Sequence, residues 1–157
     1  MLDNRLIITY AGESGLFADT YTEQELAIAA EKYLSALGDI KALLLSGELG
    51  AGKTTLAACI LKAAGAQDII TSPTFTICNT YETPLLKGFI LHADLYRIRS
   101  FAELEQTGFF ELLEQAELTL IEWGEPIKDF LARYAEINIL IDGEKRSYTF
   151  SKFYNHK

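Results

Sequence analysis

The sequence has little of what would place it in an oxidising compartment, a membrane or a nucleic-acid groove. Only two of its 157 residues are cysteine, Cys59 and Cys78, and we expect both to be buried thiols rather than a disulfide or metal pair. No apolar run approaches the roughly 20 residues of a membrane span, and the first residues lack the long apolar segment of a signal peptide. Lys and Arg number 14 against 22 Asp and Glu, which gives a net charge of −8. We therefore expect a cytoplasmic protein that does not bind nucleic acid through bulk charge.

A glycine-rich segment at residues 47–55 reads GELGAGKTT, which fits the pattern G-x-x-x-x-G-K-[ST] of the phosphate-binding loop called Walker A. The apolar run at 42–46 precedes the segment and predicts a buried strand. Residues 55–64 follow it and predict a helix. Strand, loop and helix in this order are the setting that the motif requires. The alternative is a glycine-rich turn before a helix, with a solvated lysine.

The residue types of this loop suit a nucleotide. Its three glycines can take backbone angles that are closed to other residues, so that N–H groups surround an anion. The helix that begins near Gly52 directs its positive end to the same place. We expect Lys53 to reach the β- and γ-phosphates and the Thr54 hydroxyl to ligate Mg²⁺. The predicted ATP- or ADP-binding residues here are Gly47, Glu48, Leu49, Gly50, Ala51, Gly52, Lys53, Thr54 and Thr55.

Helices and strands alternate along the chain. A capping pattern at 22–25 starts a predicted helix that ends at Gly38, and Pro126 suits the first turn of a helix that runs to about Tyr134. We predict one α/β domain, residues 1–157, with a largely parallel central sheet, flanking helices and antiparallel additions. The predicted strands are 6–10, 42–46, 75–82, 88–96, 118–122, 137–141 and 147–153, and further helical segments are expected at 100–107 and 110–116.

The strand at 118–122 reads LTLIE and is similar to a Walker B strand, which delivers a carboxylate beside Mg²⁺. Aspartate is usual at that position and this chain has Glu122, whose longer side chain could touch the metal, a metal-bound water or the attacking water. A strand that ends in a solvated acid is the alternative. Trp123 follows, and two interpretations stay open for it: it covers the nucleotide or a partner, or it seals the core.

The segment HADLYR at 92–97 places polar groups at the end of a strand. Alternation along a strand puts His92, Asp94 and Tyr96 on one face. Asp94 could hold a water on Mg²⁺, orient the attacking water or pair with Arg97. We expect His92 to be a structural histidine rather than a metal ligand, and Arg97 and Arg99 either contact phosphates or a partner or are exposed to solvent.

The segment Ser72-Pro73-Thr74 lies where many P-loop proteins have a switch that senses the γ-phosphate. Thr74 could supply a hydroxyl or a carbonyl near Mg²⁺. A simple turn is the alternative.

Four segments in this order, GELGAGKTT, SPTFT, HADLYR and LIEWGE, resemble the TsaE family, bacterial P-loop ATPases of tRNA threonylcarbamoyladenosine synthesis. The resemblance covers about residues 22–141. It departs from the family pattern at Ala93, where an aromatic residue is frequent, and at Gly124, where proline is frequent. Neither departure removes a phosphate or metal group, and the segment after Gly143 matches only loosely.

The resemblance implies a compact nucleotide-binding domain with ATP and Mg²⁺. In it Lys53 and Thr54 serve the phosphates and the metal, Glu122 is the Walker B-type acid and a second metal-site residue, and Asp94 is important for catalysis. Thr22 would lie near the adenine. The resemblance also implies docking on the TsaB–TsaD pair, in which TsaD transfers the threonylcarbamoyl group to adenosine 37 of tRNA. This chain would then meet tRNA only through that complex and would have no membrane partner.

Three functions are compatible with these residues. A slow ATPase controlled by its partners is the leading one. A small-molecule kinase would need an acceptor pocket and usually an arginine-bearing lid, whereas the chain's candidate arginines are scattered. A non-catalytic, nucleotide-gated binding module would bind ATP or ADP without turnover. The arginines in question are Arg97, Arg99, Arg133 and Arg146.

Overall fold

The computed structural model describes residues 5–9, 23–67, 77–143 and 145–155. Predictions that fall on Thr22, on Ser72-Pro73-Thr74 or on the start of the strand at 75 lie outside these ranges. The order of elements along the chain is β1 (Arg5–Thr9), α1 (Glu23–Leu37), β2 (Ala42–Gly47), α2 (Lys53–Ala63), β3 (Cys78–Glu82), β4 (Phe89–Asp94), α3 (Phe101–Glu105), α4 (Phe109–Gln115), β5 (Leu118–Glu122), the 3₁₀ turn η1 (Glu125–Ile127), β6 (Arg133–Asp142) and β7 (Lys145–Asn155).

The strands of the described ranges form one seven-stranded sheet in the order β1-β7-β6-β2-β5-β4-β3. The four central strands, β6, β2, β5 and β4, run parallel to one another. Antiparallel strands extend the sheet on both sides, with β7 and β1 beyond β6 and with β3 beyond β4. This arrangement confirms the predicted fold class, a parallel centre with antiparallel additions.

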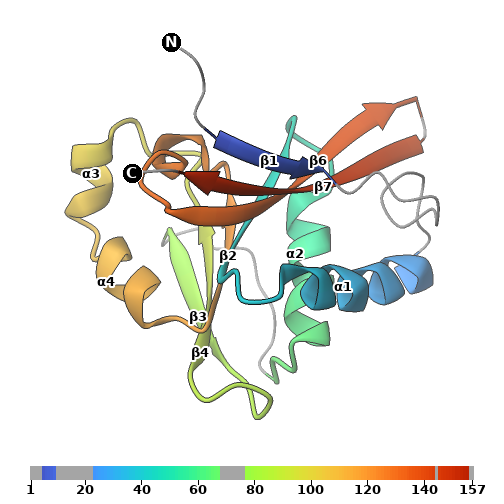
Figure 1. Cartoon of the computed structure of the whole chain (residues 1–157), viewed down its shortest axis with the longest axis horizontal. Helices are drawn as coiled ribbons and strands as arrows, with labels where there is room; N and C mark the ends of the chain where they lie inside the picture. Colours follow the sequence, from blue (N-terminus) through green and yellow to red (C-terminus); the bar gives the residue numbers. More distant parts are fainter. Residues whose placement is uncertain (1–4, 10–22, 68–76, 144, 156–157) are drawn as a thin grey trace.

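Helices cover both faces of the sheet, with α1 and α2 on one face and α3 and α4 on the other (Figure 1). The leucine run of β2 shows why helices must cover both faces of this strand. Leu43 and Leu45 pack in the core cluster that includes the residues of α1 and α2, whereas Leu44 packs in the cluster with Leu104 and Phe109. Successive side chains of a strand point to opposite faces, so a central parallel strand is apolar at every position.

The helix boundaries follow local signals. α1 ends at Leu37, and Gly38 takes a φ of 62°, the left-handed conformation that glycine adopts after a helix. Ser100 caps α3 by accepting a hydrogen bond from the Glu103 N–H at 3.1 Å. No helix in the described ranges is both long and apolar enough to cross a membrane.

The predicted helix from Pro126 to Tyr134 is wrong. Only residues Glu125–Ile127 form a 3₁₀ turn, and the chain enters β6 at Arg133. Tyr134 lies in the strand, where its ring stacks on that of Phe153 on β7, with centroids 4.7 Å apart. Long-range pairing therefore overrides the local helical pattern.

The expected burial of the two cysteines is also wrong. Cys59 and Cys78 are each partly exposed, and no disulfide joins them. They lie on α2 and at the start of β3.

Candidate functional site

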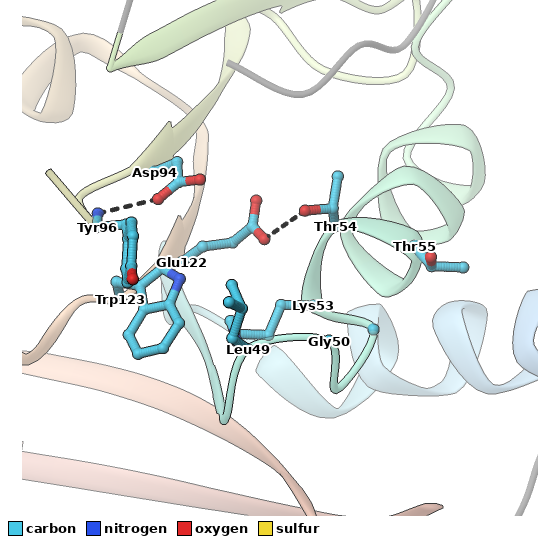
Figure 2. Close-up of a pocket in the computed structure, with 10 residues that line it drawn as sticks. Leu49, Gly50, Lys53, Thr54, Thr55, Asp94, Tyr96, Glu122 and Trp123 are labelled. Carbon is cyan, nitrogen blue, oxygen red and sulfur yellow. Dashed lines mark hydrogen bonds between the residues drawn. The ribbon is translucent and has the colours of Figure 1, made fainter. Parts of the chain in front are cut away.

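Three neighbouring parallel strands end at the same edge of the sheet. β2 runs into the glycine-rich loop after Gly47, β5 ends at Glu122 and β4 ends at Asp94. The carboxyl ends of parallel strands are the usual ligand-binding edge of an α/β sheet. A cavity of about 340 Å³ lies here (Figure 2), lined by Leu49, Gly50, Gly52, Lys53, Thr54, Thr55, Asp94, Tyr96, Glu122 and Trp123.

The loop backbone depends on glycine where it turns. Gly50 and Gly52 have φ values of 81° and 102°, which L side chains rarely adopt. At Gly47 a Cβ atom would lie 2.7 Å from the carbonyl oxygen of Ile139 on β6. The loop can therefore approach the neighbouring strand only because this position has no side chain.

The first turn of α2 borders the cavity. Gly52 is the N-cap of this helix and has no side chain with which to cap its N–H groups, and the first turn contains no acidic residue. The N–H groups of a helix's first turn and the positive end of its dipole favour a negative charge. Since Gly52, Lys53 and Thr54 all line the cavity, the geometry suits an anion such as a phosphate.

Lys53 brings its charge into this region with little exposure, since the residue is only 5% exposed. Its Nζ atom donates to the carbonyl oxygens of Gly47 at 2.7 Å and Glu48 at 2.8 Å. The same ammonium lies over the Trp123 ring, 4.1 Å from the centroid. Lys53 thus contacts both the backbone of the loop that precedes it and the Trp123 ring, which lines the cavity.

Glu122 faces the first turn of α2 from the end of β5. The residue is 2% exposed, and its Oε1 atom accepts a hydrogen bond from the Thr54 hydroxyl at 2.7 Å (Figure 2). Its Oε2 atom lies 2.8 Å from Nε2 of His92, which is fully buried. A buried carboxylate with a partner on each oxygen has a fixed orientation.

Asp94 lies beside Glu122 because the two residues are register partners on β4 and β5. One Asp94 oxygen accepts the Tyr96 N–H at 2.9 Å. Burial raises the pKa of the Asp94 carboxyl; the Tyr96 N–H opposes this shift and the charge of Glu122 adds to it. Burial also lowers the pKa of the Lys53 ammonium, against the opposing effect of the nearby carboxylates.

Trp123 takes a φ of 57°, a conformation that bulky residues rarely adopt and that is often found at functional sites. Its ring lies 4.8 Å from that of Tyr96, centroid to centroid and tilted by 51°. Both rings line the cavity. Of the two interpretations of Trp123 that the sequence leaves open, this position favours a wall of the cavity over a seal of the core.

The side-chain oxygen atoms of Thr54 and Glu122 are ligands of the kind that suits a magnesium ion. Across the described residues, no group of three or more His, Cys, Asp and Glu side chains is placed to hold a metal by itself. Mg²⁺ in nucleotide sites typically takes only one or two protein oxygens and completes its shell with phosphates and water. One hydroxyl and one carboxylate, 2.7 Å apart, match that pattern.

Most predicted site residues meet at this cavity. The predicted residues that line it are Leu49, Gly50, Gly52, Lys53, Thr54, Thr55, Asp94, Glu122 and Trp123. Gly47 and Glu48 contribute carbonyl groups to Lys53, and Ala51, also in the loop, is fully buried. Arg97 and Arg99 are exposed and do not line it. The expected site residue Thr22 lies outside the described residues.

Three residues that contact the cavity residues or the loop were not among the predicted site residues: Tyr96, His92 and Arg146. Strand alternation already placed Tyr96 and His92 on the face of Asp94, so the signal for these two was present. Arg146 of β7 donates to the loop carbonyls of Ala51 and Gly50, and no local pattern indicates this contact.

Comparison with known proteins gives the family. The family model described as threonylcarbamoyl adenosine biosynthesis protein TsaE matches residues 20–149. The chain belongs to the TsaE family. A TsaE protein of Rickettsia bellii is 40% identical over 128 residues, which are 80% of this chain and 87% of that protein.

More distant TsaE relatives agree. A TsaE protein of Aquifex aeolicus is 33% identical over 129 residues, 80% of this chain and 88% of that protein. The crystal structure of YdiB from Bacillus subtilis superposes with a TM-score of 0.64 at 26% identity and covers 94% of this chain and 84% of that one. The resemblance to the TsaE family seen in the sequence is thereby confirmed.

Proposed function

We propose that this single-domain chain is a Mg²⁺-dependent ATP hydrolase, weak alone, that supports formation of threonylcarbamoyladenosine at position 37 of tRNA. It would do so by docking on the TsaB–TsaD complex and coupling ATP binding or hydrolysis to turnover of that complex. Membership of the TsaE family supports the pathway. The geometry of the cavity supports the chemistry.

One observation carries the proposal. Thr54, the residue after the loop lysine, donates its hydroxyl hydrogen to Glu122 at the end of β5. In P-loop NTPases the corresponding hydroxyl and a carboxylate at a strand end together hold Mg²⁺. Both groups line the same cavity as Lys53 and the start of α2, so a site for a metal–triphosphate is assembled from three elements.

The residues have separate tasks in this proposal. The loop backbone from Gly47 to Thr55 and the start of α2 bind the phosphates, and Lys53 neutralises charge on the β- and γ-phosphates. Thr54 and Glu122 hold Mg²⁺, which supplies positive charge to the phosphate oxygens when bound. Trp123 borders the nucleotide.

Asp94 is the proposed residue for orienting the attacking water. Asp94 lines the cavity beside Glu122. The raised pKa of this carboxyl makes it a better proton acceptor than an ordinary aspartate, which suits a general base.

The lining of the cavity supports control by a partner. Among the described residues that line it, none is an arginine, and an arginine that stabilises the transition-state charge is worth about 10³–10⁵ in kcat. We therefore expect slow hydrolysis by the chain alone. The net charge of −8 fits a protein that meets tRNA only indirectly, through TsaB–TsaD.

The test is steady-state hydrolysis of Mg²⁺-ATP by the purified chain, alone and with the TsaB–TsaD pair. We expect slow hydrolysis that increases when the pair is present. Tight ATP or ADP binding without turnover, even with the pair, would replace the proposal by a nucleotide-gated binding module. Transfer of labelled γ-phosphate to a metabolite rather than to water would replace it by a kinase.

A further inference from the structure

Arg146 reaches the phosphate-binding loop from a distant part of the chain. Its Nε atom donates to the carbonyl oxygen of Ala51 at 3.0 Å, and an Nη atom lies 3.4 Å from the carbonyl oxygen of Gly50. The residue lies on β7, 95 positions after Ala51. We propose that Arg146 is a positioning residue that holds the loop backbone in its anion-binding orientation. This inference rests on the proposed function, since it assigns a task in nucleotide binding.

The hairpin formed by β6 and β7 contacts the loop at two points. Gly47, where the loop begins, is the register partner of Ile139 on β6. Arg146 is the register partner of Ile141 across the hairpin. One hairpin therefore fixes both the start of the loop, through the sheet, and its middle, through the arginine.

Peptide geometry explains what the arginine can do. The peptide bonds of the described chain are trans, so the C=O and N–H of one peptide unit point in opposite directions. A donor that holds the Ala51 carbonyl on one side of the loop turns the Gly52 N–H to the other side. Gly52 lines the cavity and Arg146 does not, so the arginine contacts the loop from outside the cavity.

The Gly52 N–H is the group that this arrangement makes available. The preceding N–H, of Ala51, already donates to the Glu48 carbonyl at 3.0 Å. The N–H groups at Gly52 and in the first turn of α2 are therefore among the donors left for a phosphate. Their orientation depends on the two peptide units that flank Ala51, and these are the units whose oxygens Arg146 contacts.

The loop has few other restraints at these units. A Cβ atom at Gly50 or Gly52 would meet nothing within 4 Å, so packing does not hold either glycine, and glycine has the largest conformational freedom to lose. The Ala51 side chain is fully buried, which anchors its Cα, and the Ala51 N–H bond to Glu48 holds the Gly50–Ala51 peptide unit. Neither contact stops the Ala51–Gly52 peptide plane from rotating. Hydrogen bonds from a charged guanidinium are stronger than neutral ones and oppose that rotation.

The experiment compares Arg146→Met and Arg146→Lys with Arg133→Met, all in the full chain. Arg133 is a matched control because it lies on the same hairpin but pairs with Asp39 at the surface, with its side chain 49% exposed. Two quantities are measured: the affinities for ATP and for ADP by calorimetry, and amide hydrogen exchange of the loop without nucleotide. Thermal unfolding of each variant checks the fold.

We expect Arg146→Met to weaken ATP and ADP binding alike, by about tenfold, the effect of losing one hydrogen bond to a charged group. Exchange of the Gly52 and Lys53 amides should accelerate while exchange in the sheet and the unfolding temperature stay at wild-type values. Arg146→Lys should recover part of both effects, because lysine can still donate to one carbonyl. Arg133→Met should change neither.

Three results would overturn the inference. Unchanged nucleotide affinity and loop exchange would show that Arg146 does not position the loop. Weaker ATP binding with normal ADP binding would assign it to the γ-phosphate instead. Faster exchange throughout the sheet with a lower unfolding temperature would make it a general structural residue. A wild-type chain that binds neither nucleotide would defeat the proposed function, and the exchange comparison would still decide the role of Arg146.

Discussion

The Thr54 hydroxyl donates a hydrogen bond to Oε1 of Glu122, 2.7 Å away and 68 positions further along the chain. The second oxygen of the same carboxylate lies against His92. One edge of Glu122 therefore faces the first turn of α2, and the other is held by a buried imidazole. The neighbours of Glu122 therefore orient its carboxylate without help from a metal or a nucleotide.

Replacing Glu122 by glutamine tests whether its charge holds Mg²⁺. The amide has nearly the same shape and can keep hydrogen bonds to Thr54 and His92, so the fold should be retained. We expect the apparent Mg²⁺ affinity in ATP hydrolysis to fall by at least about 10-fold, since losing a group that merely orients a metal ligand already costs about 10- to 100-fold. A Mg²⁺ titration of the hydrolysis rate measures it.

Glu117→Gln is the matched control for that prediction. Glu117 pairs with Lys41 at the surface and lies just before β5, at the opposite end of the strand from Glu122. Its variant should show wild-type Mg²⁺ dependence. An unchanged Mg²⁺ dependence of Glu122→Gln itself would remove Glu122 from the metal site.

Lys53 and Trp123 predict an optical signal for nucleotide binding. Trp123 is the single tryptophan of the chain, and the Lys53 ammonium lies 4.1 Å from its ring centroid. A nucleotide that draws the ammonium toward its phosphates changes the surroundings of the ring, so ATP and ADP should alter the tryptophan fluorescence. In Lys53→Met we expect that response to be lost and hydrolysis to fall by about 100- to 1,000-fold.

Two measurements check the origin of this signal. Trp123→Phe should remove the nucleotide-dependent fluorescence while the protein remains folded. Normal hydrolysis by a folded Lys53→Met variant would defeat the assignment of residues 47–55 as a phosphate-binding loop.

Local patterns in the sequence were sufficient for the elements that position the site. The apolar run of β2, the glycine loop and α2 are consecutive in the chain, so each signal needs no knowledge of distant residues. Parallel strands bring their carboxyl ends together, which explains why Glu122 and the loop could be expected on the same edge. The capping of α3 by Ser100 is likewise local.

The errors concern contacts between distant segments. The segment after Pro126 has a helical pattern, but Tyr134 stacks on Phe153 across the β6–β7 hairpin, and this pairing decides its conformation. The register of the same hairpin brings Arg146 to the loop. Neither the hairpin register nor the positive φ of Trp123 can be read from neighbouring residues alone.

The pKa of Asp94 predicts a pH-dependent difference in stability. Burial raises this pKa above the ordinary value of 3.8. At a pH between 3.8 and the higher pKa of the folded state, the folded state therefore binds more protons than the unfolded state. The free energy of unfolding then falls as the pH rises through this window, and the penalty is complete once the pH lies above the folded-state pKa. Asp94→Asn removes the penalty and can still accept the Tyr96 N–H.

We therefore expect Asp94→Asn to unfold a few degrees above the wild type at pH 7, while losing hydrolysis. The difference in unfolding temperature should shrink as the pH is lowered through the window toward 3.8. Asp129→Asn, at an exposed position, controls for removing one negative charge from a chain of net charge −8. A stability difference that stays constant with pH would show that ionisation of Asp94 is not its cause.

Variants of Gly47 and Gly143 compare a glycine that lies close to a neighbouring strand with one that does not. Both have positive φ, 153° and 62°. A Cβ atom at Gly47 would lie 2.7 Å from the Ile139 carbonyl oxygen, whereas at Gly143 it would meet nothing within 4 Å. We expect Gly143→Ala to lose about 1 kcal/mol in the free energy of unfolding, from backbone strain alone. Gly47→Ala should lose up to about 3 kcal/mol more, because a backbone atom cannot rotate away.

Urea unfolding of the two variants measures these losses, and ATP affinity gives an independent readout. Pushing Gly47 away from β6 moves the start of the phosphate-binding loop, so Gly47→Ala should also bind ATP more weakly, whereas Gly143→Ala should bind it normally. Equal losses of stability with equal ATP affinity would mean that only the backbone angle matters at Gly47. In that case the contact between β6 and the loop would have no part in shaping the site.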